Sequence, residues 1–174
     1  MGRQVRMVPA DWQHPKYADN HDPAYLCGRY IPLLDRSYSK DAAEWDEYRR
    51  QWLLGLRESY GTGEKWVPIE PEYVGMRYTE YGGERPSPDD YMPDWPPEQR
   101  THLMMYEDTS EGTPISPAFE TPEELARWLA DTNASAFGGD GATYDQWLST
   151  CKRGWAVSAV FSSAGLQSGV AALT

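Results

Sequence analysis

The sequence has few cysteines and no long hydrophobic run. Cys27 and Cys151 are the only cysteines among 174 residues, and they stand far apart. Two distant cysteines, with no CxxC motif and no spaced Cys/His pair, argue against a disulfide framework and against a zinc site. No run approaches the roughly 18 apolar residues of a membrane span, and residues 1–12 lack the apolar segment of a signal peptide. We therefore expect a soluble intracellular protein with no membrane partner.

Positive charge is also scarce, with 16 Lys/Arg against 27 Asp/Glu and a net charge of −11. Residues 1–40 carry +2, residues 41–100 carry −7 and residues 101–174 carry −6. A chain this acidic repels the phosphate backbone, so direct nucleic-acid binding is not expected. The chain could instead occupy a site that nucleic acid normally fills. The alternative is that acidity only keeps a Trp-rich surface soluble.

Phenylalanine is rare while the other aromatic residues are abundant, with three Phe against eight Trp and twelve Tyr. Most large side chains therefore carry a polar group that needs a partner at a surface or interface, which favours a binding protein. A chain of 174 residues with 40% hydrophobic content is long enough for one core and short for two full domains. A single domain over residues 1–174 is expected.

The N-terminal part, residues 1–81, is expected to be loosely organised around one helix. Residues 3–9 alternate as a short edge strand does, and an irregular loop follows at 11–22. An amphipathic, core-facing helix is predicted over 40–58 from the three- and four-residue spacing of its apolar side chains. These side chains are Trp45, Tyr48, Trp52, Leu53 and Leu56. Short strands are expected at 65–69 and 73–81.

The middle of the chain, residues 82–100, contains five prolines and five acidic residues. This composition excludes a regular helix or a central strand. We interpret the segment as a solvated connector. The alternative is a semi-rigid arm that presents Tyr91, Met92 and Trp95 to a partner, because proline limits the entropy lost on docking.

The C-terminal part, residues 101–174, carries the strongest local signals. A buried strand is expected at 101–108, and capping boxes that start at Thr121 and Thr143 predict two helices. Gly154 is expected to end the second helix in a left-handed conformation. Two β-rich runs at 155–161 and 166–173 predict a hairpin that turns around 163–165. The fold class is therefore α+β, with a small antiparallel sheet packed by two or three helices.

Catalytic and metal-binding patterns are missing. There is no GxSxG elbow, and the glycine-rich loop at 137–141 lacks the ending of a phosphate-binding loop. Cys151 is expected to be a small core residue. His14 and His21 are interpreted as ordinary surface histidines rather than metal ligands.

An acidic cluster offers the nearest approach to a cation site. Glu107, Asp108 and Glu111 stand within five residues, and with Glu123 or Asp140 they would make an oxygen-rich site. The preferred interpretation is a solvated turn together with a helix N-terminus that favours negative charge. No metal or cofactor is expected.

One long block has a family resemblance. The stretch TSEGTPISPAFETPEELARWLAD, followed by ASAFG and ATYDQWL, resembles a block in small uncharacterised proteins of tailed bacteriophages and prophages. The opening VRMVPADWQHP is similar to the start of the same proteins. The resemblance covers about the first fifteen residues and about 101–170. It implies a phage protein that acts in the host bacterial cytoplasm, and it supplies no activity and no catalytic residues.

Small acidic phage proteins without catalytic motifs often bind a host protein, and anti-CRISPR proteins are similar in size and charge. The leading hypothesis is a non-enzymatic inhibitor that occludes a basic nucleic-acid-binding surface of a host antiviral nuclease complex, such as a CRISPR effector subunit. The candidate partner-binding residues are Tyr91, Trp95, Glu107, Asp108, Glu111, Asp140 and Tyr144. The alternatives are a small phage enzyme with a pocket between the 109–111 turn and the 137–144 loop, and a virion accessory protein.

Overall fold

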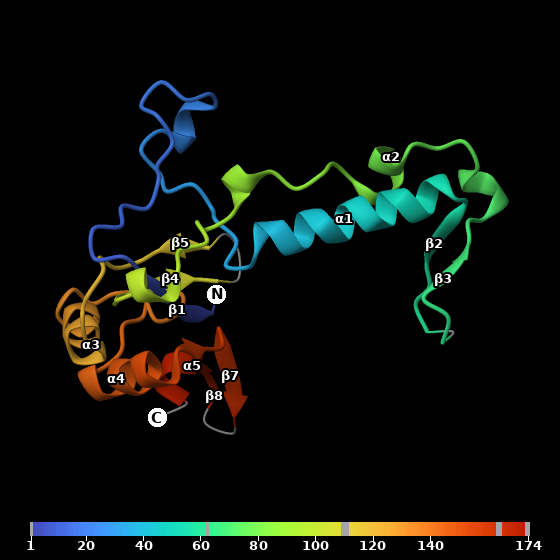
Figure 1. The fold of residues 1–174 in the computed structure, drawn as a ribbon. Coiled ribbons are helices and arrows are strands. Elements are labelled where there is room, and N and C mark those ends of the chain that lie inside the picture. The colour runs from blue at the N-terminus through green and yellow to red at the C-terminus, as the bar shows by residue number, and fades with distance from the viewer. Residues whose placement is uncertain (1, 62, 109–111, 163–164, 173–174) are drawn as a thin grey trace. The chain divides into compact units, whose positions relative to one another are not determined.

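The computed structural model describes residues 2–61, 63–108, 112–162 and 165–172 (Figure 1). Two compact units divide the chain. The sheet unit consists of Met1–Asp35 and Pro93–Thr174, and the hairpin unit consists of Arg36–Met92. Whether the two units fold as the single domain expected from the chain length stays a prediction. The mixture of helices with antiparallel strands confirms the α+β class.

The sheet unit contains a four-stranded antiparallel sheet in the order β5-β4-β1-β6. Its strands are β1 (Arg3–Val8), β4 (His102–Glu107), β5 (Thr113–Pro114) and β6 (Trp155–Ala156). β1 and β4 pair along their whole length, with Arg3 opposite Glu107 and Val8 opposite His102. β6 pairs with Arg3 and Gln4 on the other side of β1. The predicted strand at 3–9 is therefore present, but it is not an edge strand where β6 covers it.

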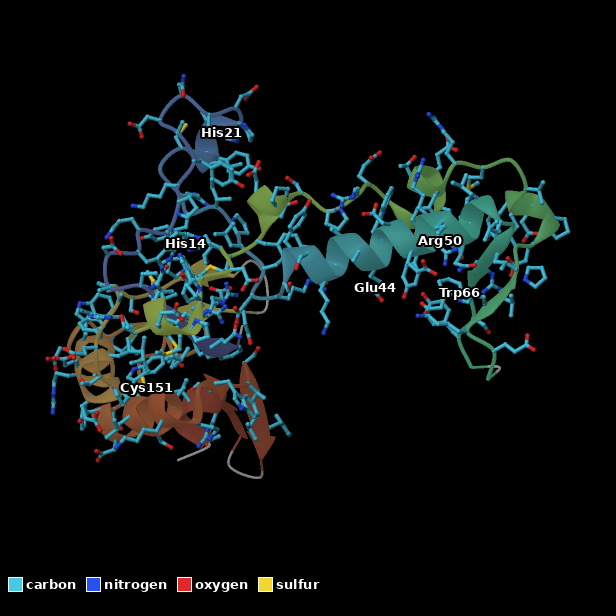
Figure 2. All side chains as sticks on the ribbon, viewed as in Figure 1. His14, His21, Glu44, Arg50, Trp66 and Cys151 are labelled. Carbon is cyan, nitrogen blue, oxygen red and sulfur yellow. The ribbon has the colours of Figure 1, made fainter. Side chains whose placement is uncertain are left out.

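The two faces of this sheet pack against different parts of the sheet unit. Side chains alternate along a strand, so Leu103 and Met105 face one way while Met104 and Tyr106 face the other. The first face packs on α3 (Pro122–Asp131) and α4 (Tyr144–Arg153) in one apolar cluster. The buried members of this cluster are Met105, Leu125, Ala126, Leu129, Ala136, Trp147, Cys151, Ala156 and Val170. The prediction that Cys151 is a core residue is confirmed, and Figure 2 shows it on α4.

Both helices of this cluster begin at the predicted caps. The Thr121 hydroxyl accepts from the Glu124 backbone N–H at 3.2 Å, and the Glu124 carboxylate accepts from the Thr121 N–H at 3.2 Å. The same exchange joins Thr143 and Gln146. Gly154 ends α4 at a φ of 91°, in the left-handed region predicted for it.

The C-terminal hairpin is shorter than expected. β7 (Ala159–Ser162) pairs with β8 (Gly165–Ser168), which confirms a hairpin, although its turn at 163–164 lies outside the described residues. The predicted second strand continued to 173, but the chain turns into α5 (Gly169–Ala172). The Ser168 hydroxyl accepts from the Ala171 N–H at 3.0 Å, and this side-chain cap starts the helical turn.

The hairpin unit is organised around one long helix. Its elements are α1 (Tyr38–Leu53), β2 (Leu56–Glu58), β3 (Trp66–Pro68), η2 (Pro71–Tyr73), α2 (Tyr78–Gly82) and η3 (Pro88–Asp90). The helix was predicted to reach residue 58, but Gly55 takes a φ of +79° and the chain enters β2, which pairs with β3. Trp52 is buried as expected, whereas Leu53 is exposed.

The predicted strand at 73–81 is wrong. This stretch contains the end of η2 and the start of α2. The Glu80 carboxylate accepts from the Arg77 backbone N–H at 2.9 Å, which satisfies a donor at the start of a helix rather than one in a strand ladder. The proline-rich stretch predicted at 82–100 begins with Gly82, the last residue of α2, and then forms the short turns η3 and η4 (Pro97–Gln99). No helix among the described residues is long and apolar enough to cross a membrane.

Candidate functional site

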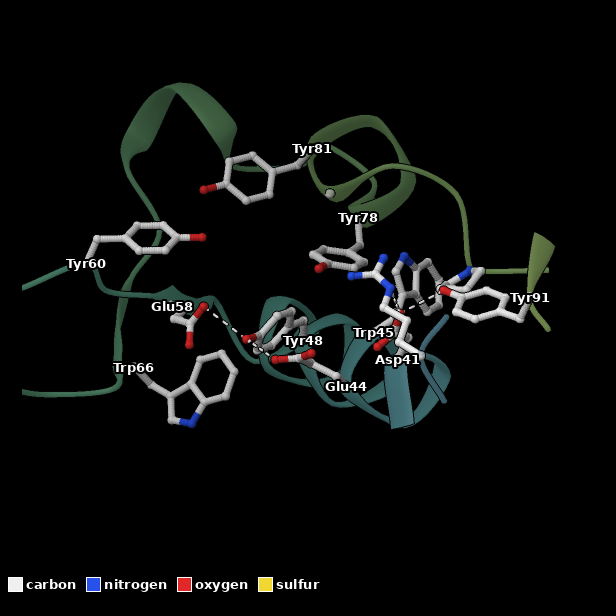
Figure 3. A pocket seen from close by; sticks show the side chains of 13 residues that line it. Asp41, Glu44, Trp45, Tyr48, Glu58, Tyr60, Trp66, Tyr78, Tyr81 and Tyr91 are labelled. Atoms are coloured by element: carbon white, nitrogen blue, oxygen red, sulfur yellow. Dashed lines mark hydrogen bonds and ion pairs between the residues drawn. The ribbon is translucent and has the colours of Figure 1, made fainter. Parts of the chain in front are cut away.

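The hairpin unit contains a pocket of about 620 Å³, shown in Figure 3. Four of its lining residues, Asp41, Glu44, Trp45 and Tyr48, lie at three- and four-residue steps and so share one face of α1. The other lining residues come from the hairpin, from α2 and from the segments beside them. They are Arg36, Glu58, Tyr60, Trp66, Tyr78, Tyr81, Gly82, Pro86 and Tyr91. We call this cavity the acidic aromatic pocket.

Aromatic contacts hold the rings of the acidic aromatic pocket in place. The Tyr48 and Trp66 rings meet edge to face with centroids 5.5 Å apart, and Trp45 meets Tyr78 in the same way at 5.3 Å. The Trp45 indole N–H also donates to the Gly83 carbonyl at 3.1 Å. Edge-to-face pairs of this kind fix ring orientation. The pocket therefore presents ring faces and edges in a fixed arrangement.

Two carboxylates in the acidic aromatic pocket compete for one proton. The Tyr48 hydroxyl oxygen lies 2.8 Å from Glu44 Oε1 and 3.0 Å from Glu58 Oε2 (dashed lines in Figure 3). A phenol has a single proton and can donate it to only one acceptor at a time. Burial, and then the two carboxylates, raise the pKa of Tyr48, so the phenol stays protonated. One of the two carboxylates is therefore always without the Tyr48 proton.

Cations already occupy two places at the edge of this pocket. Arg36 Nε lies 2.7 Å from Asp41 Oδ2, which also accepts from the Tyr91 hydroxyl at 2.9 Å. Lys65 Nζ lies 5.2 Å from the centroid of the Trp66 ring. Within the described part of the chain, neither Glu44 nor Glu58 has a Lys or Arg partner in an ion pair. Asp41 is thus neutralised, while the Glu44–Glu58 pair is not.

A second pocket, of about 860 Å³, lies in the sheet unit beside Trp12, His14 and Tyr30. His14 was predicted at the surface, but it is buried. Figure 2 shows His21 farther along the same loop. The ring of His14 packs between Tyr30 and Tyr106 and makes a hydrogen bond through each nitrogen. These contacts pay for its burial and identify it as a structural residue.

The hydrogen bonds of His14 fix its tautomer. Nε2 lies 2.7 Å from the Ile31 carbonyl oxygen, which can only accept, so Nε2 carries the proton. Nδ1 of the neutral ring is then an acceptor, and the Tyr106 hydroxyl donates to it at 3.1 Å. The Trp12 indole N–H in turn donates to the Tyr106 oxygen at 3.2 Å. Burial lowers the pKa of His14, and the nearby Arg6 guanidinium lowers it further.

The two aromatic residues predicted to be presented to a partner are packed within the structure. Tyr91 is only 6% exposed, because its ring packs on Tyr38 and its hydroxyl donates to Asp41. Trp95 is half-buried in the sheet unit, with its ring 4.7 Å from that of Trp12. The proposed arm therefore does not expose Tyr91, although this residue does line the acidic aromatic pocket.

The predicted acidic residues lie in the sheet unit. Glu107 ends β4 and Asp108 is exposed just after it, while Glu111 and the whole 109–111 turn lie outside the described residues. Asp140 is exposed in its loop, and Tyr144 begins α4 with the Arg127 guanidinium 4.0 Å from its ring centroid. Among the described residues, no group of three or more His, Cys, Asp or Glu could hold a metal ion.

The acidic aromatic pocket was not predicted from the sequence. Trp45 and Tyr48 were placed on one helix face but assigned to the core, and both are only half-buried. A usable signal was present, because Asp41 and Glu44 stand on that same face among the rings. Two acidic residues on an otherwise aromatic face indicate that the face meets solvent or a ligand and not a dry core.

Scans against protein-family models, curated proteins and solved structures return no match. The chemistry of the pockets must therefore carry the functional conclusion. Aromatic faces attract cations through their quadrupole, and carboxylates attract them through charge. The described lining of the acidic aromatic pocket includes no His, Cys or Ser, and its anionic groups are the carboxylates of Asp41, Glu44 and Glu58. The arrangement is suited to holding a cation.

Proposed function

We propose that this protein is a phage-encoded, non-enzymatic inhibitor that binds a basic surface of a host antiviral nuclease complex, such as a CRISPR effector. The observation that carries this proposal is the acidic aromatic pocket. Its Glu44–Glu58 pair has no cationic partner within the described residues, and its rings offer contact area at little entropic cost. A basic protein surface supplies the missing charge.

The distribution of charge supports a basic partner. The hairpin unit has 8 Lys/Arg and 12 Asp/Glu, and the sheet unit has 8 and 15, so both are acidic. Acidic surfaces repel nucleic acid and associate quickly with lysine- and arginine-lined channels. Such channels belong to proteins that bind nucleic acid. The resemblance to phage proteins suggests that the channel belongs to a bacterial defence complex.

The alternatives have less support. The enzyme hypothesis needs a pocket between the 109–111 turn and the 137–144 loop, but the first wall lies outside the described residues. Neither pocket described above is lined by residues 137–144. The virion-accessory hypothesis makes a separate prediction, which is that the chain co-purifies with phage particles.

The test is a phage-plating assay in cells that carry an active CRISPR interference system against the infecting phage. We expect the wild-type chain to restore plating, and the double variant Glu44→Gln/Glu58→Gln to lose this effect. Glu72→Gln/Glu84→Gln makes the same charge change outside the pocket and serves as the matched control. The proposed target would be refuted if cells that express the wild-type chain still suppressed phage plating with every CRISPR class tried.

A biochemical version of the test measures the complex directly. The tagged chain is incubated with nuclease-treated lysate at about 50 mM and about 300 mM salt, a range over which exposed charge pairs become strongly screened. We expect a nuclease complex to be retained at the lower concentration and to weaken at the higher one. Retention that does not change with salt would contradict an electrostatic mode of binding.

A further inference from the structure

We infer that the acidic aromatic pocket is an arginine-binding site, in which Glu44 and Glu58 accept hydrogen bonds from a partner's guanidinium and Trp66 and Tyr48 provide ring contacts. This inference rests on the proposed function for the existence of a protein partner. The chemical group that enters the pocket is a guanidinium. Three observations support it, and each concerns a different property of the site.

The first observation is the charge imbalance around Tyr48. Glu44 Oε1 and Glu58 Oε2 both lie within 3.0 Å of one hydroxyl oxygen that holds one proton. Both carboxylates therefore keep most of their hydrogen-bonding capacity, and their like charges repel each other. A ligand with several donors and a positive charge relieves both deficits together. An anion would meet repulsion at the same place.

The second observation is that a cation of the chain itself already uses these rings. Lys65 Nζ lies 5.2 Å from the Trp66 ring centroid and 5.9 Å from that of Tyr48. Both distances fall within the range in which a ring face attracts an ammonium group. The Lys65 side chain is exposed, so a ligand can displace it at little cost. The rings are therefore placed to contact a cation beside the carboxylate pair.

The third observation concerns the shape of the ligand. A guanidinium is planar, stacks on aromatic rings and offers five donors in a fixed fork, whereas an ammonium is a compact and strongly hydrated point charge. Arginines elsewhere in the chain bind in both ways, through the fork and on a ring. Arg85 donates through two nitrogens to Asp46 at 3.0 and 2.9 Å, and Arg6 lies 4.3 Å from the Tyr106 ring centroid. A site with two carboxylates beside ring faces suits this fork better than a point charge.

The probe for the experiment is N-acetyl-arginine amide, titrated into the full chain. N-acetyl-citrulline amide has nearly the same shape without the charge, and N-acetyl-lysine amide carries the charge without the plane. Binding is followed through the indole N–H signals in NMR spectra, with the signals of Trp45 and Trp66 assigned by Trp→Phe variants. We expect a dissociation constant on the order of 1 mM for a single side chain, with citrulline binding at least about tenfold more weakly.

Variants test which residues make the site. Glu44→Gln and Glu58→Gln keep an acceptor for Tyr48 but remove a charge, and we expect each to weaken arginine binding about five- to tenfold. Glu72→Gln, which lies outside the pocket lining, should leave it unchanged. Trp66→Phe should retain more binding than Trp66→Leu, because it keeps a ring face. An unchanged indole signal from Trp52, which is buried in the same unit and donates to the Met76 carbonyl, shows that each variant is folded.

The outcomes separate this inference from the proposed function. Citrulline binding as tightly as arginine, or full binding by both glutamine variants, would overturn the arginine site. Lysine binding as tightly as arginine would overturn its preference for a guanidinium. Arginine binding without any nuclease partner would keep the site and refute the function. A nuclease complex retained equally by Glu44→Gln/Glu58→Gln would keep the function and refute the site.

Discussion

The hydrogen-bond chain through Tyr106 in the sheet unit gives a prediction with a definite magnitude. Tyr106→Phe keeps the buried ring but removes the hydroxyl that accepts from Trp12 and donates to His14. The change removes one hydrogen bond to each neighbour and leaves the buried acceptor Nδ1 of His14 without its donor. One lost hydrogen bond costs about 1 kcal/mol, and an unsatisfied buried group costs about 1–3 kcal/mol. We expect a loss of about 2 kcal/mol in the free energy of unfolding at pH 8.

The loss should depend on pH in a defined direction. Burial holds the pKa of folded His14 below its ordinary value of 6.5. A depressed pKa contributes stability that is fully present above about pH 6.5 and is lost as the pH falls through the folded pKa. Once His14 is protonated, Nδ1 carries a proton and Tyr106 can no longer donate to it. The difference between wild type and Tyr106→Phe should therefore shrink on acidification.

Two measurements check this reasoning. Urea denaturation between pH 5 and pH 8 gives the free energies, and NMR titration of the three histidines gives the pKa of His14 in each protein. In Tyr106→Phe we expect this pKa to rise, since the hydrogen bond from Tyr106 to the neutral ring is gone. Tyr30→Phe is the control, because its ring also touches His14 while its hydroxyl has no hydrogen bond within the described residues. Equal losses in the two variants, or an unchanged titration of His14, would refute the assigned tautomer.

Three further predictions concern single positions. Gly112→Ala places a Cβ against the Leu33 carbonyl oxygen at a φ of +60°, so it should lower the free energy of unfolding, measured by urea denaturation, by at least about 2 kcal/mol. Gly139→Ala, at a φ of +97° with open space around it, should cost only about 1 kcal/mol. Thr143→Ala removes the cap of α4 and should cost about 1 kcal/mol, measured in the same way. Lys65→Gln removes the cation nearest Trp66 and should tighten the binding of N-acetyl-arginine amide; weaker binding would mean that Lys65 helps to build the site.

The parts of the fold that were predicted correctly depend on local chemistry. The caps at Thr121 and Thr143 and the end of α4 at Gly154 involve residues within four positions of each other, so the sequence specifies them directly. The end of α1 was missed because the apolar spacing continues past Leu53 while Gly55 turns the backbone. Periodicity measures where side chains would point if the helix continued, and it does not detect where the backbone leaves the helix.

The carboxylate pair of the candidate site could not be predicted because its two members lie on different elements. The carboxylate pair of the acidic aromatic pocket joins Glu44 of α1 to Glu58 of β2, and β3 then brings Trp66 opposite Glu58. Spacing along one element shows that rings share a face, but it does not show whether that face meets a core or a cavity. The burial of His14 was missed for the same reason, since both of its hydrogen-bond partners are far away in the sequence.

The abundance of Trp and Tyr is a weaker sign of an interface than the sequence suggested. The indole N–H groups of Trp12, Trp45 and Trp52 all donate within the chain, to the Tyr106 hydroxyl and to the carbonyls of Gly83 and Met76. These aromatic residues have their polar groups satisfied and serve as framework. The sign of function lies instead at polar groups whose hydrogen bonding is incomplete, such as the two carboxylates that share one Tyr48 proton.

This imbalance predicts opposite effects of one substitution on stability and on binding. Glu58→Gln keeps an acceptor for Tyr48 and removes the repulsion between the two carboxylates. We expect the free chain to become more stable by about 0.5 kcal/mol, the size of an exposed charge interaction, while arginine binding weakens. Urea denaturation and the NMR titration on the same protein samples measure the two effects. If the Glu44–Glu58 pair stabilises the fold, Glu58→Gln will lower the free energy of unfolding. If the pair serves to bind a cation, Glu58→Gln will raise it, because the repulsion between the two carboxylates is relieved only when the cation binds.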